Sequence, residues 1–261
     1  MHITTSNVLL GKVPETVFIG ENLDFDPASV TDPDFSTFYV SSDNNRLTLD
    51  FGAVETINYV AYAGLNISGN KDFTSRVRIR DGSTKIATTF VSMDTCVLVM
   101  FEARTFTNLR IGMFNAKGDE QPRVSFIAAG TAFEVPNGGE GSGYNRQFLN
   151  RNIKTKSTLS DIAAPIALLT KKISAKGRLN IPNVTRSFSE STWQDFLDFS
   201  MVNHFFIREQ DPVPFQWPEG EVTNNNSAYL CFDAEKSKTS AHSGTRALNN
   251  VSLSFKVFNG L

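Results

Sequence analysis

Short segments in which apolar and polar residues alternate occupy the first half of this 261-residue chain. Residues 76–80 (Arg-Val-Arg-Ile-Arg) alternate strictly and lead into the turn Asp81-Gly82-Ser83, and residues 47–51 (Leu-Thr-Leu-Asp-Phe) alternate in the same way. A period of two is typical of a β-strand with one buried face. Similar segments recur up to residue 127, whereas no helical period of useful length occurs before residue 187. The pattern predicts a β-sandwich or jelly roll.

A glycine-rich segment divides the chain into two halves of different charge. Residues 136–143 hold four glycines in eight positions, too many for a packed element. Residues 1–136 carry 11 basic and 16 acidic residues, whereas residues 137–261 carry 14 basic and 11 acidic residues. We therefore predict one domain at 1–136 and a second at 144–261, joined by a linker at 137–143.

The second half favours strands with a single helix. Ser187 followed by Glu190 matches a capping box, in which Ser187 is the N-cap. Five residues that follow are spaced as on one face of a helix. They are Trp193, Phe196, Leu197, Ser200 and Met201. We predict a helix over 188–202 within a second β-sandwich. The predicted fold class is therefore mainly β, with an N-terminal jelly-roll sandwich and a C-terminal sandwich that carries one helix.

Residues that catalytic and metal sites require are scarce. The three histidines, His2, His204 and His242, have no spacing that suits a metal site or a catalytic triad. Cys96 and Cys231 lie in apolar strand segments, which favours buried thiols. We expect no enzymatic activity and no cofactor. The first residues lack the pattern of a secretion signal, so we also expect synthesis in the cytoplasm.

Several carboxylates lie in turn-rich segments, among them Asp32, Asp34 and Asp43. Turns use aspartate to hydrogen-bond the backbone, and this is the preferred interpretation. A calcium site is the alternative, because Ca²⁺ takes carboxylate oxygens. We predict no metal site.

The strand pattern of the first half resembles that of a known family. Residues 47–52 (Leu-Thr-Leu-Asp-Phe-Gly) and 57–64 (Ile-Asn-Tyr-Val-Ala-Tyr-Ala-Gly) are similar to a strand pair of discoidin-like, galactose-binding-like jelly rolls, and residues 106–111 are similar to a late strand of that fold. The resemblance implies a sandwich that grips glycans at its loop ends. Sugar sites commonly join an aromatic platform to polar side chains, and the candidates here are Tyr39, Tyr62, Asn66 and Arg76.

The second half resembles another group. Residues 177–182, the helix with Trp193 and Phe196, and residues 204–209 look like small structural proteins of the tail tip of tailed bacteriophages, such as distal-tail and hub proteins. The resemblance implies a unit that assembles into a ring through repeated subunit contacts.

A basic strip adds to this interpretation. Residues 144–178 hold eight basic residues and one acidic residue. A strip of one charge favours pairing with an acidic strip on a neighbouring subunit, and nucleic-acid binding is disfavoured because interleaved aromatic residues are lacking. The candidate interface residues are Lys171, Lys172, Lys176, Arg178, Trp193 and Phe196.

Two functional hypotheses follow. The leading one is a virion structural protein that forms a homo-oligomeric ring and joins the tail tube to the tip or to receptor-binding proteins. It would be located in the phage tail after synthesis in the host cytoplasm. The alternative is a carbohydrate-binding adhesin that contacts host-surface glycans.

Overall fold

The computed structural model divides the chain into two compact units, which are described separately. The first unit holds residues 1–138 and 202–230, and the second holds residues 139–201 and 231–259. The structure describes residues 1–19, 26–32, 37–43, 46–66, 75–90, 96–114, 121–136, 153–159, 165–172, 175–208, 215–216, 222–223, 228–243 and 245–257.

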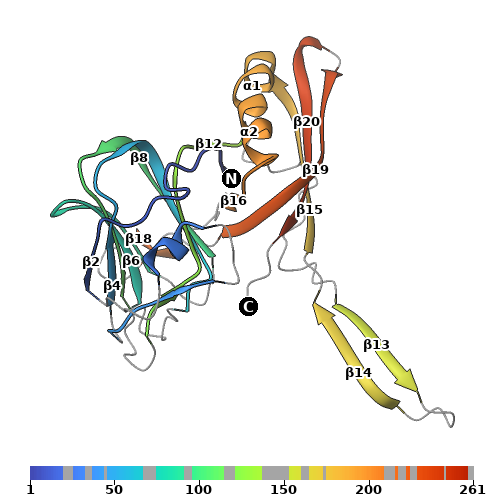
Figure 1. Ribbon diagram of the computed structural model, residues 1–261. Helices are drawn as coiled ribbons and strands as arrows, with labels where there is room; N and C mark the ends of the chain where they lie inside the picture. The colour runs from blue at the N-terminus through green and yellow to red at the C-terminus, as the bar shows by residue number, and fades with distance from the viewer. Residues whose placement is uncertain are drawn as a thin grey trace. The chain divides into compact units, whose positions relative to one another are not determined.

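The first unit is a β-sandwich of two antiparallel sheets (Figure 1). The five-stranded sheet has the order β2 (Thr16–Ile19), β4 (Arg46–Asp50), β9 (Leu109–Phe114), β6 (Arg76–Asp81) and β7 (Thr84–Phe90). The three-stranded sheet has the order β11 (Phe126–Gly130), β5 (Val54–Ala63) and β8 (Cys96–Phe106). Two short strands, β3 (Tyr39–Val40) and β10 (Arg123–Val124), pair with each other, and a 3-10 helix, η1, spans Pro27–Val30.

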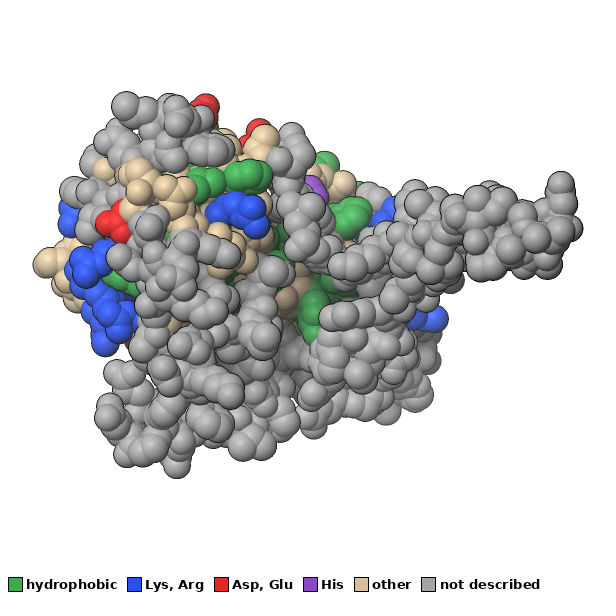
Figure 2. All heavy atoms as spheres, turned by 90° about the horizontal axis from the view of Figure 1, so that it is seen from below, with side chains coloured by type: hydrophobic (Ala, Val, Ile, Leu, Met, Phe, Trp, Pro, Cys, Tyr) green, Lys and Arg blue, Asp and Glu red, His purple; other side chains and the backbone are tan. Residues whose placement is uncertain are grey.

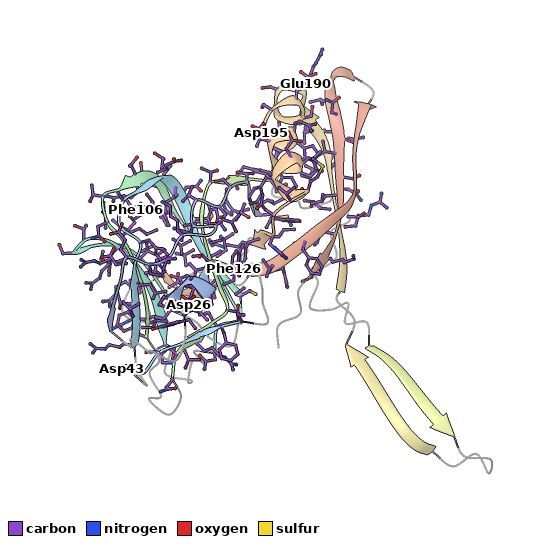
Figure 3. The ribbon with its side chains drawn as sticks, in the orientation of Figure 1. Asp26, Asp43, Phe106, Phe126, Glu190 and Asp195 are labelled. Atoms are coloured by element: carbon purple, nitrogen blue, oxygen red, sulfur yellow. The ribbon has the colours of Figure 1, made fainter. Side chains whose placement is uncertain are left out.

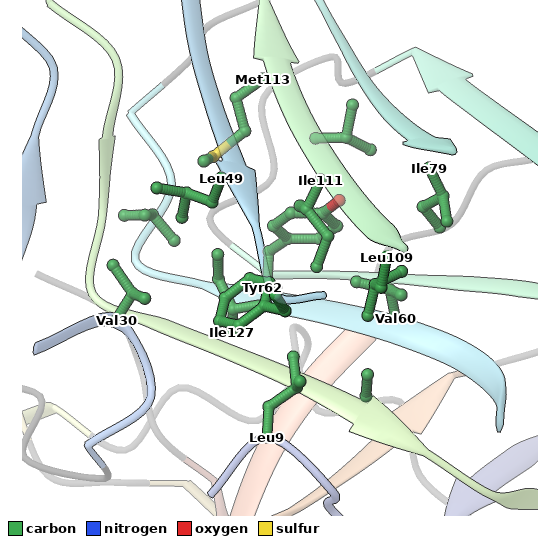
Figure 4. Close-up of a cluster of buried hydrophobic side chains, with 14 of the residues drawn as sticks. Leu9, Val30, Leu49, Val60, Tyr62, Ile79, Leu109, Ile111, Met113 and Ile127 are labelled. Carbon is green, nitrogen blue, oxygen red and sulfur yellow. The ribbon is translucent and has the colours of Figure 1, made fainter. Parts of the chain in front are cut away.

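One hydrophobic core lies between these sheets. Leu49 and Ile111 reach it from the five-stranded sheet, and Val60 and Ile127 reach it from the three-stranded sheet (Figure 4). All four side chains are fully buried. Burying a side chain of this size contributes about 1.5–3 kcal/mol. The predicted alternation is confirmed in β6, where Val77 and Ile79 are both buried in the core.

A second group of strands in the first unit joins residues far apart in the sequence. Strand β1 (His2–Thr4) pairs with β12 (Ala132–Glu134) on one side and with β16 (Phe205–Arg208) on the other. The Thr4 hydroxyl accepts a hydrogen bond from the Phe206 backbone N–H at 2.8 Å. The Phe206 ring stacks on Phe126 with 6.3 Å between the ring centroids. This pairing explains why residues 202–230 group with the first unit, so the predicted domain at 144–261 is interrupted there.

The second unit carries long strands and the helical segment. Strand β15 (Ala175–Thr185) pairs with β20 (Thr245–Val257), which pairs with β19 (Ala228–Ser243). Two short helices, α1 (Arg186–Glu190) and α2 (Thr192–Ser200), follow β15 directly. Asn249 on β20 donates to the Ser189 hydroxyl on α1 at 2.6 Å. A hairpin of β13 (Ile153–Leu159) and β14 (Pro165–Lys172) completes the described strands of the second unit. The short pair of β17 (Phe215–Gln216) and β18 (Val222–Thr223) belongs to the first unit.

The helical segment begins earlier than the sequence predicts. Its N-cap is Thr185, not Ser187, because the Thr185 hydroxyl accepts a hydrogen bond from the Phe188 N–H at 3.2 Å. The segment also bends at Ser191, whose φ and ψ of −116° and −87° are not helical. The predicted apolar face is only partly correct: Trp193 is buried, but Met201 is 71% exposed. The predicted fold class, mainly β with one helical segment in the second half, is confirmed.

Candidate functional site

Two of the predicted sugar-contacting residues lie in the hydrophobic core. Tyr39 and Tyr62 are both fully buried, so neither ring offers a platform to a ligand. The Tyr62 ring points among the core side chains in Figure 4. Burial raises the pKa of the Tyr62 hydroxyl well above its usual value of 10. Their assignment to a sugar site is therefore corrected, because both side chains fill the sandwich instead.

Asn66 has a local structural role. Its side-chain amide donates to the Gln121 carbonyl at 3.0 Å, and its side-chain oxygen accepts from the Arg123 N–H. The Arg123 guanidinium lies over the Phe38 ring, 5.1 Å from the ring centroid. Asn66 thus fastens the segment after β5 to the segment before β10.

One of the three predicted calcium candidates, Asp43, serves a turn. Asp43 accepts a hydrogen bond from the Arg46 N–H at 3.1 Å and lies where β4 begins (Figure 3). Asp32 is exposed and follows η1, and Asp34 lies outside the described residues. Within the described ranges, no group of three His, Cys, Asp or Glu side chains could hold a metal ion.

Arg76 belongs to a cluster on the outer side of the five-stranded sheet. In the strand register, Arg46 on β4 lies opposite Phe114 on β9, and Phe114 lies opposite Arg76 on β6. One row further along, Arg78 on β6 lies opposite Thr88 on β7. Their neighbours along each strand face the core, so these side chains share the opposite side. We call this cluster the arginine face; it consists of Arg46, Arg76, Arg78, Thr88 and Phe114.

An aromatic ring forms the centre of the arginine face. The guanidinium carbons of Arg78, Arg76 and Arg46 lie 4.9, 5.4 and 6.0 Å from the Phe114 ring centroid. These are cation–π distances. The ring lies close over Gly112, where an added Cβ would be 3.1 Å from Phe114 Cε2. The missing side chain at position 112 therefore lets the ring lie against the sheet.

Polar atoms of the arginine face have no hydrogen-bond partner among the described residues. They are Arg76 Nε, Arg78 Nε and Thr88 Oγ1, and all three are shielded from solvent. Burial, and then the charges of Arg76, Arg80 and Arg46, lower the pKa of Arg78 from its usual value. The cluster therefore holds several positive charges and unused donors close together, an arrangement that an anionic or polar ligand would stabilise.

Other arginines of the same unit are paired with carboxylates. Arg110 Nε donates to Asp50 at 2.9 Å, and Arg104 donates to Asp81 at 3.2 Å. In the described part of the chain, no comparable ion pair involves an arginine of the arginine face. Figure 2 shows Lys and Arg side chains gathered at the left edge of that view, over the part of the first unit that holds β2, β4 and β6.

The predicted interface residues of the second unit differ in accessibility. Trp193 and Phe196 are fully buried, with their ring centroids 5.3 Å apart, so the prediction that they contact a neighbouring subunit is corrected. They fill the space beside the helical segment, which Glu190 and Asp195 mark in Figure 3. Arg178 on β15 is exposed. The backbones of Lys171 and Lys172 lie in β14 and that of Lys176 lies in β15, while their side chains fall outside the description.

The remaining residues that the sequence singled out do not form a site in the described ranges. His2 and His204 are half-buried, and the His242 side chain is not among the described ones. Cys96 and Cys231 are buried thiols. Among the described residues, no helix has the length and apolar character that a membrane-spanning helix needs.

Comparison with known proteins gives structural resemblances only. No protein-family model and no curated protein sequence matches the chain. The model is similar to chitosan-binding module 1 of a chitosanase/glucanase from Paenibacillus sp. IK-5, with 16% identity over 48% of this chain and 98% of the module and a TM-score of 0.39. It is also similar to CpGH89CBM32-5 from Clostridium perfringens in complex with GalNAc-β-1,3-galactose, with 13% identity over 48% of this chain and 99% of that one and a TM-score of 0.37.

A third similar structure is the lectin binding domain of Lectinolysin complexed with Lewis b, with 12% identity over 49% of this chain and 96% of that one and a TM-score of 0.36. Similarity at this level does not identify a ligand of the present chain. The arginine face is therefore the part of the described chain from which a ligand is inferred.

Proposed function

We propose that this chain is a non-catalytic carbohydrate-binding protein whose first unit holds a glycan on the arginine face. The observation that carries the proposal is the Phe114 ring, which lies on the outer side of a sheet among three guanidinium groups. An apolar ring surrounded by polar donors suits a sugar, which has an apolar ring face and a hydroxyl-bearing edge. The ligand-binding role corresponds to the alternative hypothesis from the sequence. Of the four residues predicted there, this site keeps Arg76 alone.

The donors around the ring are fixed by the sheet. Arg76 and Arg78 are two residues apart on β6, so both project from the same side. Arg76 and Arg78 are half-buried, whereas their Nε atoms and Thr88 Oγ1 are shielded from solvent and lack partners within the described residues. A ligand would therefore approach each guanidinium group at its other nitrogens. A site on strands holds its side chains more rigidly than a site on loops does.

A glycan array with the full-length chain tests this proposal. We expect binding to a limited set of glycans, and we expect Phe114→Ala to remove it without unfolding the protein. The half-buried Phe38 provides a matched control, since it also lies under a guanidinium but at another place in the first unit. Unchanged binding by Phe114→Ala, together with lost binding by Phe38→Ala, would move the site to the segment near Asn66.

A second function, assembly with further copies of the chain, is supported by the hairpin of β13 and β14. Among the described strands, these two pair only with each other. An isolated two-stranded hairpin is marginally stable in water. A neighbouring subunit that covers the hairpin would offset this cost, as the tail-tip hypothesis requires.

Light scattering on the purified chain tests this second function. The assembly hypothesis predicts a closed oligomer that Lys171→Glu combined with Lys172→Glu dissociates. The same charge reversal at Lys12, an exposed residue of the first unit, is the control and should leave the oligomer intact. A monomer at all concentrations would contradict assembly by this chain alone.

A further inference from the structure

We infer that the ligand of the arginine face is an anionic glycan, whose acidic group binds Arg76 and Arg78 while a sugar ring lies against Phe114. This inference rests on the proposed function and adds the chemical class of the ligand. It predicts discrimination between acidic and neutral forms of the same sugar.

The arginine face concentrates positive charge. Arg46, Arg76 and Arg78 gather around one ring, and within the described ranges none forms an ion pair. Nearby arginines such as Arg110 show that this sheet can supply a carboxylate where a counter-charge is needed, since Asp50 lies in the same sheet. A cluster left without a counter-charge is stabilised most by a ligand that brings one.

The hydrogen-bonding capacity of Arg76 and Arg78 also favours an acidic group. Arg76 Nε, Arg78 Nε and Thr88 Oγ1 are shielded from solvent and have no partner among the described residues. Thr88 lies directly across the strand pair from Arg78, so its hydroxyl and that guanidinium share one side of the sheet. A carboxylate or sulfate accepts several hydrogen bonds at once, and guanidinium donors match its geometry. A neutral hydroxyl would satisfy fewer of these donors.

The extent of the cluster favours a glycan over a nucleic acid. Arg46 and Arg76 lie on strands two positions apart, which corresponds to about 10 Å across the sheet. Residues 1–136 carry five more acidic than basic residues, from 16 acidic and 11 basic. Duplex DNA carries one negative charge per about 1.7 Å of its axis, so a long nucleic acid would extend well beyond this small cluster, along a part of the chain whose net charge is negative. A short segment with one or two acidic groups avoids that repulsion.

The test compares acidic and neutral members of matched glycan pairs on the full-length chain. The probes are galacturonate oligomers with their methyl esters, sialyllactose with lactose, and sulfated with unsulfated glycosaminoglycan oligosaccharides. Isothermal titration calorimetry gives Kd at about 50 mM and about 300 mM NaCl, because salt screens an exposed charge pair. We expect at least one acidic member to bind about 10- to 100-fold more tightly than its neutral partner, with weaker binding at the higher salt.

Variants assign the effect to the arginine face. Arg76→Gln and Arg78→Gln should each weaken binding of the acidic member by about tenfold or more, and binding of the neutral member by a smaller factor. The control is Arg186→Gln, the same substitution at an exposed arginine of the second unit, which should change neither Kd. Thermal unfolding of each variant confirms that the protein is folded.

Each outcome decides one claim. Equal binding of acidic and neutral members, unaffected by Arg76→Gln and Arg78→Gln, would overturn the anionic specificity and leave carbohydrate binding in place. Failure to bind any glycan would reject the proposed function itself. Binding of duplex DNA through the same arginines, with no acidic glycan bound, would reject both and assign the arginine face to nucleic acid.

Discussion

Gly112 lies under the ring of Phe114 on strand β9, and a Cβ atom at position 112 would be 3.1 Å from Phe114 Cε2. The glycine thus permits the orientation of the ring that brings it among three guanidinium groups. A glycine inside a strand usually weakens the strand, so its presence here fits a functional use of the space above it.

Gly112→Val should separate binding from stability. The branched side chain displaces the Phe114 ring, so we expect glycan affinity to fall about tenfold while stability stays equal or rises by up to about 1 kcal/mol, because valine favours strands. Urea unfolding and calorimetric titration measure the two effects. If affinity were unchanged while Phe114→Ala abolished it, the orientation of the ring would not matter to the ligand.

Substitution by glutamine should affect stability differently at Arg78 and at Arg110. Arg78→Gln removes a charge that Arg76, Arg80 and Arg46 repel, so we expect stability at pH 7 to stay equal or to increase. Arg110→Gln leaves the nearly buried Asp50 without its 2.9 Å partner and should cost about 1–3 kcal/mol.

Denaturant unfolding of these two variants at low salt checks this contrast. A large loss of stability in Arg78→Gln would show that this arginine supports the fold, which would contradict its assignment to ligand binding. Added salt should reduce any gain from Arg78→Gln, because it screens the repulsion that the substitution removes.

Asp81 should contribute stability that depends on pH. Burial opposes ionisation of this carboxyl, but hydrogen bonds from the Asn108 N–H, the Thr107 hydroxyl and the Thr107 N–H, together with the charge of Arg104, hold its pKa below the usual 3.8. The contribution is therefore fully present above that value and is lost as the pH falls through the lower folded-state pKa. Asp81→Asn should be less stable at pH 7 by about 1–2 kcal/mol.

Unfolding curves from pH 7 down to pH 2 test the direction of this pH dependence of stability. The difference in stability between the wild-type chain and Asp81→Asn should shrink in acid below the usual pKa. A difference that stays constant over the whole range would mean that the ionised carboxylate is not the stabilising form.

The two candidate N-caps of the helical segment can be told apart directly. Thr185→Ala removes the hydroxyl that accepts from the Phe188 N–H and should cost about 1 kcal/mol. Ser187→Ala, at an exposed position inside α1, should cost much less. Thermal unfolding that ranks them in the reverse order would restore the capping box that the sequence predicts.

The sequence predicts the strands well where one face is buried. In β6, the alternation predicts that Val77 and Ile79 face the core, and both are buried. The same alternation places Arg76 and Arg78 on the outer side. It does not reveal that Phe114 and Arg46 lie beside them, because that depends on the register between strands far apart in the sequence.

The errors have similar physical causes. Tyr39 and Tyr62 look like exposed platforms in the sequence, yet an aromatic residue fits either side of a strand, and the structure buries both. Trp193 and Phe196 are recognisable as one apolar helix face, but the sequence does not state whether that face covers its own sheet or a second subunit. One sequence feature could have pointed to Phe114 as a site residue, namely the glycine two positions before it in a strand segment.

A crystal structure of the full-length chain with an acidic oligosaccharide tests the central claim most directly. The expected result is an acidic group within hydrogen-bond distance of the guanidinium groups of Arg76 and Arg78, with a sugar ring over Phe114. A ligand bound instead at the segment that joins Asn66 and Arg123, with the arginine face empty, would contradict it.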